Sequence, residues 1–264
     1  MKLTVKNMSS CVDRRMFILK QIEKDEQVNV SELSQHFSVS EVTIRKDLKH
    51  LEKKNILIRS RGGAMKQSLI NTDLSIYDRR KQNIELKEAI GIAAANLISE
   101  GETILLDTGT SIMELAKHLP KKIDITVITN SVDVTFRLAE HQNIRVIMPG
   151  GILRRNSLAL VGEQAAESLR GYHCDQYFLS ADGIDIQKGM MTMNIEEAFL
   201  ARLNIKNSKK VIALIDSSKF QKSGVISIAP LTEIDILITD SGISSDILDK
   251  IKKMGVEVIV VKTI

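Results

Sequence analysis

The sequence predicts an α/β protein in two parts: a small helical module with a β-hairpin, then a larger, mostly parallel, doubly wound α/β domain. Within the first 66 residues, two short amphipathic helices precede a glycine-tipped hairpin. From Ile84 onward, apolar strand-like runs alternate with helical stretches. The stretch 67–83 is polar with little periodicity. We therefore expect domains at 1–66 and 84–264, joined by a linker at 67–83.

The first two helices have the spacing of a helix-turn-helix. Ser31 and Ser40 can each cap a helix, because a hydroxyl satisfies a free backbone N–H at a helix start. In the second helix Ile44, Leu48 and Leu51 recur at i, i+4 and i+7 and form one apolar face. The opposite face is basic, which is typical of a helix that enters the DNA major groove. We expect this helix to contact DNA through Ser40, Val42, Thr43, Arg45, Lys46 and Lys49.

The segment 56–65 is expected to form a β-wing. Its apolar residues give way to Arg59 and Arg61, and Gly62 with Gly63 permits the positive φ of a tight turn. Arginines near a hairpin tip suit phosphates or the minor groove, so Arg59, Arg61 and Gly62 join the predicted DNA contacts. The alternative is a small helical bundle whose basic face is only solvated. It does not account for the order of helix, turn, basic helix and hairpin.

Charge is concentrated where the motif lies. Residues 1–66 hold nine Lys and five Arg against eight Asp and Glu, a net charge of +6, whereas the whole chain is +4. Neutralisation of DNA phosphates requires such a distribution. Hydrophobic residues make up 43% of the chain and aromatic residues 3%, with no Trp. The core should therefore be aliphatic.

The composition favours a cytoplasmic protein without metal or other cofactor. No run approaches the roughly 18 apolar residues of a membrane span, and the first residues lack the apolar stretch of a signal peptide. Cys11 and Cys174 cannot make a disulfide framework, and a redox switch between them would have to cross domains. The five His are not spaced with Cys or carboxylates as metal ligands are.

The helix-turn-helix residues resemble the DeoR family of bacterial transcriptional regulators. The similarity is clearest in the run 38–48 and in the wing end 62–64, and it extends over residues 14–261. Lys46 and Arg61 stand where the family usually has Arg and His. Because Arg and Lys differ in bidentate reach, another member's operator sequence cannot be carried over. The resemblance implies a second domain like the ribose-phosphate-isomerase and CoA-transferase folds.

Seven apolar runs of the second domain are expected to be strands, several of them buried on both faces as in parallel sheets. They are Thr103–Asp107, Ile125–Thr129, Ile144–Met148, Gln176–Ser180, Val211–Ile215, Ile234–Thr239 and Val256–Val261. Helices are expected at Ile112–Leu119, Val132–His141, Glu196–Lys206 and Ser245–Met254. Parallel α/β sheets bind ligands beyond the carboxyl ends of their strands, so the residues that follow each strand are the candidate ligand contacts.

Small, hydroxyl-bearing or charged residues follow most of these strands. The glycine-containing turn 107–111 precedes a helix and suits an anion, because free N–H groups and the helix dipole point at it. Nearby cations and carboxylates would suit a phosphorylated sugar, although a glycine or Asp-Gly after a strand is often only a turn. The expected effector contacts are Asp107, Gly109, Thr110, Ser111, Asn130, Gly150, Gly151, Arg154, Asp182, Gly183, Asp216 and Lys219.

The family resemblance supports this interpretation and adds two residues. Its effector domain typically senses a phosphorylated sugar or related metabolite, and its motifs look like the turns at 107–110, 129–131, 182–183 and 216–219 and like Gly150, Gly151 and Arg154. Lys87 and Glu197 also match recurrent positions, although a solvated helix face would explain them as well. Ser111 stands where Thr is common and keeps the hydroxyl.

The sequence therefore predicts a transcriptional regulator, foremost a repressor of a carbohydrate-utilisation operon that is relieved by a phosphorylated sugar. A homodimer or homotetramer is expected, because two-fold symmetry matches paired half-sites of operator DNA. One alternative is a sugar-phosphate isomerase-like enzyme with a DNA-binding appendage, using Asp107, Asp182, Glu197 and Lys219. Fold analogy alone does not establish such an activity. Another is an activator that senses a non-sugar metabolite.

Overall fold

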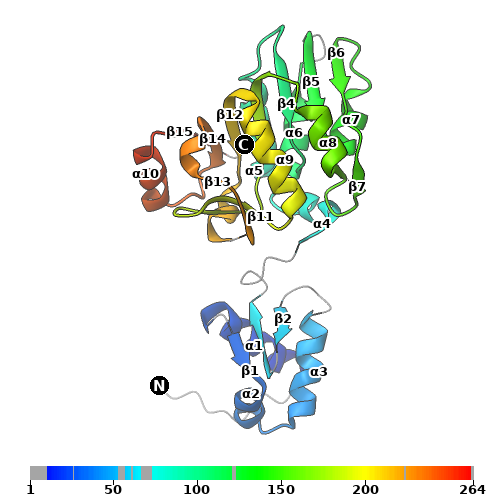
Figure 1. The fold of residues 1–264 in the computed structure, drawn as a ribbon. Coiled ribbons are helices and arrows are strands. Elements are labelled where there is room, and N and C mark those ends of the chain that lie inside the picture. The colour runs from blue at the N-terminus through cyan, green and yellow to red at the C-terminus, as the bar shows by residue number, and fades with distance from the viewer. Residues whose placement is uncertain are drawn as a thin grey trace. The chain divides into compact units, whose positions relative to one another are not determined.

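The chain forms two compact units, Met1–Thr72 and Asp73–Ile264 (Figure 1). The computed structural model describes residues 11–25, 27–52, 57–60, 62–66, 73–120, 123–222 and 224–262. Residues 73–83, which the sequence places in a linker, are part of the second unit and contain the helix α4 (Ile76–Arg80). The rest of the expected linker, 67–72, lies outside the described residues.

The first unit is a winged helix-turn-helix, as predicted. Its elements are α1 (Cys11–Asp25), β1 (Gln27–Asn29), α2 (Val30–Phe37), α3 (Glu41–Glu52), β2 (Leu57–Ser60) and β3 (Gly63–Lys66). The strands form an antiparallel sheet in the order β1-β3-β2. Ile18 of α1, Ile44 and Leu48 of α3 and Leu57 of β2 are all buried in one core. The apolar face predicted for α3 therefore packs inward.

Two details of this unit differ from the sequence expectations. The cap of α2 is Asn29, whose side chain accepts a hydrogen bond from the Ser31 N–H at 2.8 Å, so Ser31 is not the cap. The strand β1 is added to the wing, and Gly63 allows it to approach. A Cβ at Gly63 would lie 2.1 Å from the Val28 carbonyl oxygen. Ser40 does cap α3, because its hydroxyl accepts from the Thr43 N–H at 3.3 Å.

The second unit is built on a seven-stranded parallel sheet. The strand order is β15-β14-β12-β9-β4-β5-β6, and every neighbouring pair is parallel. The strands are β4 (Thr103–Leu106), β5 (Ile125–Thr129), β6 (Ile144–Ile147), β9 (Cys174–Leu179), β12 (Ser208–Leu214), β14 (Ile236–Asp240) and β15 (Glu257–Val261). They match the seven predicted runs with small shifts at the ends. The prediction of a parallel sheet is confirmed.

Helices cover both faces of this sheet. One face packs against α5 (Ile84–Ala95), α6 (Thr110–His118) and α7 (Val132–Leu138). The other packs against α8 (Glu163–Leu169), α9 (Ile195–Lys206) and α10 (Ser245–Lys253). Side chains alternate between the two faces along each strand, so Ile104 and Leu106 join the first core and Leu105 joins the second. The domain is doubly wound, as predicted.

Several short elements of this unit are not among the predicted ones. A hairpin of β7 (Ile152–Arg154) and β8 (Ala159–Val161) follows β6. A small antiparallel sheet combines β10 (Gly183–Asp185), β11 (Gly189–Thr192) and β13 (Ile226–Ala229). Two 3-10 turns, η3 (Ser217–Gln221) and η4 (Leu231–Glu233), complete it. Met190 and Met191 of β11 are buried, so they fill core space.

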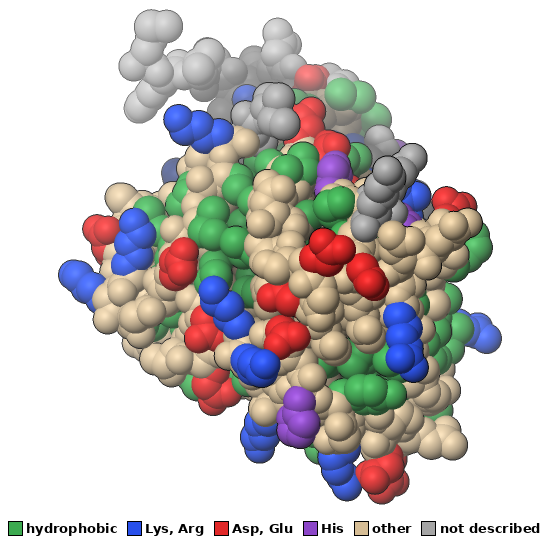
Figure 2. All heavy atoms as spheres, turned by 90° about the horizontal axis from the view of Figure 1, so that it is seen from above, with side chains coloured by type: hydrophobic (Ala, Val, Ile, Leu, Met, Phe, Trp, Pro, Cys, Tyr) green, Lys and Arg blue, Asp and Glu red, His purple; other side chains and the backbone are tan. Residues whose placement is uncertain are grey.

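Surface features add two observations. On the face in Figure 2, acidic and basic side chains are interspersed among apolar ones, so the described residues form no extended patch of one charge there. Within the described ranges, no helix is both long enough and apolar enough to cross a membrane.

Candidate functional site

The helix α3 presents the predicted DNA-binding side chains on one exposed face. Val42, Arg45, Lys46 and Lys49 are spaced at i, i+3, i+4 and i+7 and are exposed, with Val42 at 58%. Thr43 lies beside them and is half-buried. Arg45 forms an exposed ion pair with Glu41 one turn earlier, at 2.5 Å. Such a pair contributes little to stability, so the guanidinium is available to DNA.

A buried ion pair that the sequence analysis missed orients this helix. Asp47 of α3 is only 2% exposed and accepts from Arg14 at 2.5 Å and from Arg15 at 2.8 Å. Both arginines come from α1. An acidic residue on the apolar face of an amphipathic helix was the available signal, because a carboxylate there needs a buried partner.

Arg59 lies in strand β2 of the wing, and Gly62 lies in the turn that follows. Arg59 is exposed, and its guanidinium lies 3.8 Å from Glu52. Gly62 has φ of 95°, and its carbonyl accepts from the Val30 N–H at 2.8 Å. Arg61 lies outside the described residues.

The candidate effector site lies where the strand order reverses. Successive strands β4, β5 and β6 run to one edge of the sheet, whereas β9, β12, β14 and β15 run to the other. Ligands of doubly wound sheets bind beyond the carboxyl ends of the strands at this switch point. Two small cavities occur there, and Ser180 and Ala181, which follow β9, line both.

The first cavity is rich in cations and holds about 10 Å³. Its charged side chains are Arg79, Lys87, Asp216 and Lys219, and the turn 109–111 at the start of α6 completes it. Gly109 has φ of 141°, and a Cβ there would lie 2.4 Å from the Ser180 hydroxyl. Only glycine therefore allows this turn to approach β9 so closely.

Burial lowers the pKa of both lysines in this cavity. The pKa of Lys87 falls to about 8 because burial outweighs the opposing effect of Asp216, and the positive charges of Lys219 and Arg79 lower it further. Burial also lowers the pKa of Lys219, against the effects of Asp182 and Asp216. The Lys87 ammonium donates to the carbonyls of Arg79 and Gln82, each at 2.6 Å.

The second cavity is rich in carboxylates and holds about 30 Å³. Asp107, Asp182 and Glu197 line it, together with Thr108, Thr192 and Arg79. Burial raises the pKa of Asp107 to about 7; the Thr108 N–H opposes this, and the nearby Glu197 adds to it. Burial also raises the pKa of Glu197, although Ser157 and Arg154 act against it. Asp182 accepts from the Thr192 hydroxyl at 3.1 Å and from the Met193 N–H at 2.9 Å.

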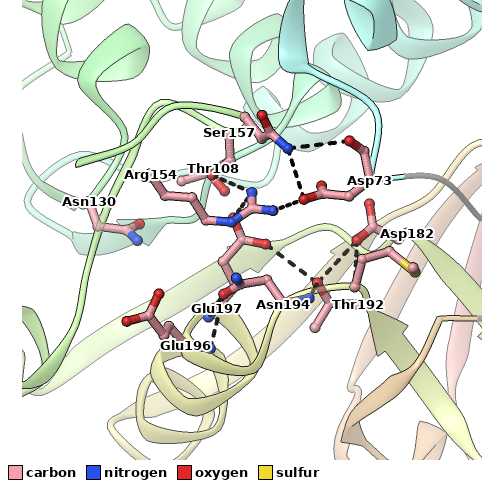
Figure 3. A network of polar contacts seen from close by, with 12 residues as sticks. Asp73, Thr108, Asn130, Arg154, Ser157, Asp182, Thr192, Asn194, Glu196 and Glu197 are labelled. Atoms are coloured by element: carbon pink, nitrogen blue, oxygen red, sulfur yellow. Dashed lines mark hydrogen bonds and ion pairs between the residues drawn. The ribbon is translucent and has the colours of Figure 1, made fainter. Parts of the chain in front are cut away.

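Arg154 lies at the centre of a polar network beside this cavity (Figure 3). Its guanidinium donates to Glu197 and to the Ser157 hydroxyl, each at 3.0 Å, and it is paired with Asp73. The Asn156 amide also donates to Asp73, at 2.9 Å. In this arrangement Arg154 holds Glu197 in place and lines neither cavity.

Four predicted effector contacts also lie outside both cavity walls. Asn130 is buried and donates to the Leu160 carbonyl at 3.1 Å. Gly151 has φ of 143°, and a Cβ there would meet the Val161 carbonyl oxygen at 2.8 Å, so close packing onto β8 explains this glycine. Gly150 precedes β7, and Gly183 begins β10. That these four residues contact an effector stays a prediction.

Arg79 is the important residue that the sequence analysis missed. It lines both cavities but falls in the stretch expected to be a linker. A capping signal was present: the Ser75 hydroxyl accepts from the Asp78 N–H at 3.3 Å and donates to the Asp78 carboxylate at 2.8 Å. Thr108, Ser180 and Thr192 were also missed as lining residues.

Comparison with known proteins identifies the relatives of this chain. A DeoR-like helix-turn-helix domain matches residues 14–68, and a DeoR C terminal sensor domain matches residues 82–241. The chain belongs to the DeoR family. The predicted family is thereby confirmed, and this DeoR-family chain is a DNA-binding transcriptional regulator.

Several relatives of this DeoR-family regulator are named as repressors. It is 37% identical over 258 residues to a protein named as the proposed transcriptional repressor of the aga operon in Escherichia coli O157:H7, covering 97% of this chain and 96% of that protein. It is 30% identical over 225 residues to the glycerol-3-phosphate regulon repressor of Escherichia coli K12, covering 85% and 88%. Ribose 5-phosphate isomerase A of Methanocaldococcus jannaschii gives a TM-score of 0.40 at 17% identity, covering 53% and 55%. That likeness is too distant to indicate an activity.

A larger hollow of about 430 Å³ occurs between α6 and α7 of this DeoR-family regulator. Three basic and three acidic side chains line it: Arg80, Lys117, Arg137, Glu114, Asp133 and Glu140. Arg80 and Asp133 pair with each other. Because these charges balance, the hollow has no preference for an anion. In the described ranges, no group of three or more His, Cys, Asp or Glu side chains is placed to hold a metal ion.

Proposed function

We propose that this DeoR-family regulator represses a carbohydrate-utilisation operon and releases its operator when a phosphorylated sugar or related metabolite binds at the carboxyl ends of β4 and β9. The observation that carries the proposal is the pairing of two cavities. One gathers three cations around the start of a helix, and the other gathers three carboxylates. A molecule with an anionic end and several hydroxyls matches both.

The phosphate would bind in the cationic cavity. The helix α6 begins after Gly109, which as a glycine brings no capping side chain, and within the described part of the chain its first N–H groups can donate to an anion. Lys87, Lys219 and Arg79 add three cations against the single carboxylate of Asp216. Removing these cations from water is costly, and a dianionic phosphate would offset that cost by charge-assisted hydrogen bonds.

The sugar hydroxyls would bind in the carboxylate-rich cavity. Ionised carboxylates accept two or more hydrogen bonds each, and the Thr108 and Thr192 hydroxyls can donate or accept. The raised pKa of Asp107 lets that group donate as well as accept near neutral pH. Such a set distinguishes a polyol from an apolar molecule, because a buried carboxylate left unpaired is costly.

One relative supports the same assignment by its name, because it is the repressor of a glycerol-3-phosphate regulon. On the DNA side, α3 and the wing of two copies would read paired half-sites, since a two-fold dimer presents two such helices. We therefore expect a homodimer or homotetramer.

A thermal-shift screen tests the proposal. The purified full chain is melted with glycerol 3-phosphate, glucose 6-phosphate, galactosamine 6-phosphate and their unphosphorylated forms. At least one phosphorylated compound should raise the melting temperature, because it binds only the folded state, and its free sugar should not. The same compound should release DNA that the protein retains without it. If no phosphorylated compound acts on a protein that binds DNA, the proposal is wrong.

The enzyme alternative has its own control. Ribose 5-phosphate is incubated with the protein, and ribulose 5-phosphate is measured. Turnover above background would favour an isomerase-like function over that of a regulator alone.

A further inference from the structure

We infer that Arg79 exchanges its contact with Asp182 for the anionic group of the effector, and that the segment 73–83, which carries Arg79, shifts at the rim of the sheet as the effector enters. This inference rests on the proposed function. It adds a binding residue that the sequence analysis placed in a linker, and it identifies the part of the second unit that must move.

Arg79 has the position and the unused bonding capacity for this role. Its side chain is 18% exposed, lines both cavities and donates to Asp182 at 3.1 Å. Its Nε–H is buried and has no hydrogen-bond partner among the described residues. A buried donor left unpaired is costly, and a guanidinium forms its strongest contacts as a two-pronged pair with phosphate or carboxylate oxygens. An anion in the cationic cavity would satisfy this donor.

The cavities are too small for the effector as they stand. They hold about 10 and 30 Å³, which is room for a few water molecules. Pockets for small organic ligands usually measure about 300 Å³ or more. Some part of the wall must therefore move before a sugar phosphate can enter.

The segment 73–83 is the movable part of that wall. Most other lining residues follow strands of the central sheet or lie on helices packed on it, whereas this segment is attached mainly through side chains. Ile76 is buried, and its N–H donates to the Asn156 carbonyl at 2.6 Å. The remaining attachments that the described residues make are polar, and they lie at the rim except for the pair of Arg80 with Asp133 at the hollow between α6 and α7.

Those polar attachments involve the groups that were predicted to bind the effector. Asp73 forms an ion pair with Arg154, and Arg79 forms one with Asp182. The Asn83 amide donates to Asp216 at 3.0 Å. The Lys87 ammonium is held by two carbonyls of the segment. Effector and segment therefore compete for the same side chains.

This competition supplies the differential affinity that a ligand-controlled switch requires. A ligand shifts an equilibrium only if it binds the two states unequally. Here the effector binds well only when the segment has shifted, because Arg79 then contacts the anion in place of Asp182. In sequence the segment follows the wing strand β3. A shift of the segment therefore acts at the start of the second unit, on the part of the chain that is connected to the DNA-binding unit.

Two neighbouring arginines of α4 provide a matched test. Arg79→Gln removes the proposed anion contact, whereas Arg80→Gln removes a pair with Asp133 at the hollow between α6 and α7. Melting shifts are titrated with glycerol 3-phosphate, glucose 6-phosphate and inorganic phosphate. Arg79→Gln should weaken binding of the responding compound about ten-fold or more, whereas Arg80→Gln, which loosens the segment without removing a cation from the cavity, should bind it at least as tightly as wild type. Equal binding by wild type and Arg79→Gln would overturn the inference but not the proposed function.

A variant that is expected to gain affinity serves as a control for misfolding, because a misfolded protein would not bind the effector more tightly. Asp73→Asn weakens the hold of the segment on Arg154, so it should bind the effector several-fold more tightly than wild type. Hydrogen exchange of peptides covering 73–83 should become faster when the effector binds. Slower or unchanged exchange, or unchanged affinity in Asp73→Asn, would show that the segment is not displaced. A wild type that responds to no phosphorylated compound would overturn both the proposed function and this inference.

Discussion

At the scale of single residues, Asp107 shows how a position in the fold changes the chemistry of a side chain. The sequence places it at the end of a strand, and the structure places it at the end of β4 in a wall of carboxylates. Burial raises the pKa of its carboxyl to about 7. Its location was predictable from the strand pattern. Its pKa was not, because Glu197 and the wall around it come from distant parts of the chain.

This raised pKa predicts how stability depends on pH. The folded state keeps a proton on Asp107 between about 4 and 7, where the unfolded state has lost it, so wild-type stability should fall as pH rises through that window. The slope from this group is at most about 1.4 kcal/mol per pH unit, and less to the extent that water reaches it. Asp107→Asn removes this contribution. The free energy of unfolding of the variant, minus that of wild type, should therefore be higher at pH 8 than at pH 5. Urea unfolding of both proteins at the two values measures this. Parallel pH profiles would contradict it.

At the scale of elements, the sequence predicts what is long and periodic and misses what is short. The seven strands of the central sheet and the amphipathic α3 were recognisable, because their apolar patterns match buried surfaces. The strands β7, β8 and β10 have three residues each, and α4 has five. Such elements are held by tertiary contacts, as Ile76 is by Asn156, and local pattern cannot show these. The missed α4 is also why Arg79 was absent from the predicted site.

The contact between α1 and α3 gives a prediction at this scale. Asp47→Ala leaves Arg14 and Arg15 near a buried position without their carboxylate, so the first unit should lose about 3 kcal/mol or more. Glu41→Gln on the same helix breaks only an exposed pair and should cost less than about 1 kcal/mol. Thermal unfolding of the two variants distinguishes them. Operator binding by Asp47→Ala should fall although its side chain faces the core. An effect as small as that of Glu41→Gln would show that the buried pair does not orient α3.

At the scale of the whole molecule, the two units are expected to divide the work. Charge, motif and family agree that the first unit binds DNA. The cavities and their buried charges lie in the second unit. The sequence predicted this division because each unit carries its own complete pattern. It could not predict that residues 73–83 belong to the rim, since their contacts with Arg154, Asp182 and Asp216 span up to 133 positions.

Two substitutions test that division. Arg45→Ala should weaken operator binding about ten-fold, because a guanidinium that reads a guanine is worth about 1–3 kcal/mol, and it should leave effector affinity unchanged. Lys219→Gln should keep operator binding and lose the response to the effector, because it removes a cation from the proposed phosphate cavity. Anisotropy titrations with DNA selected by the wild type, repeated at several salt concentrations, measure both. If Arg45 contacts a phosphate instead of a base, the slope of log affinity against log salt should fall by about one. A correctly folded variant that lost operator binding and the effector response equally would contradict this division of work between the two units.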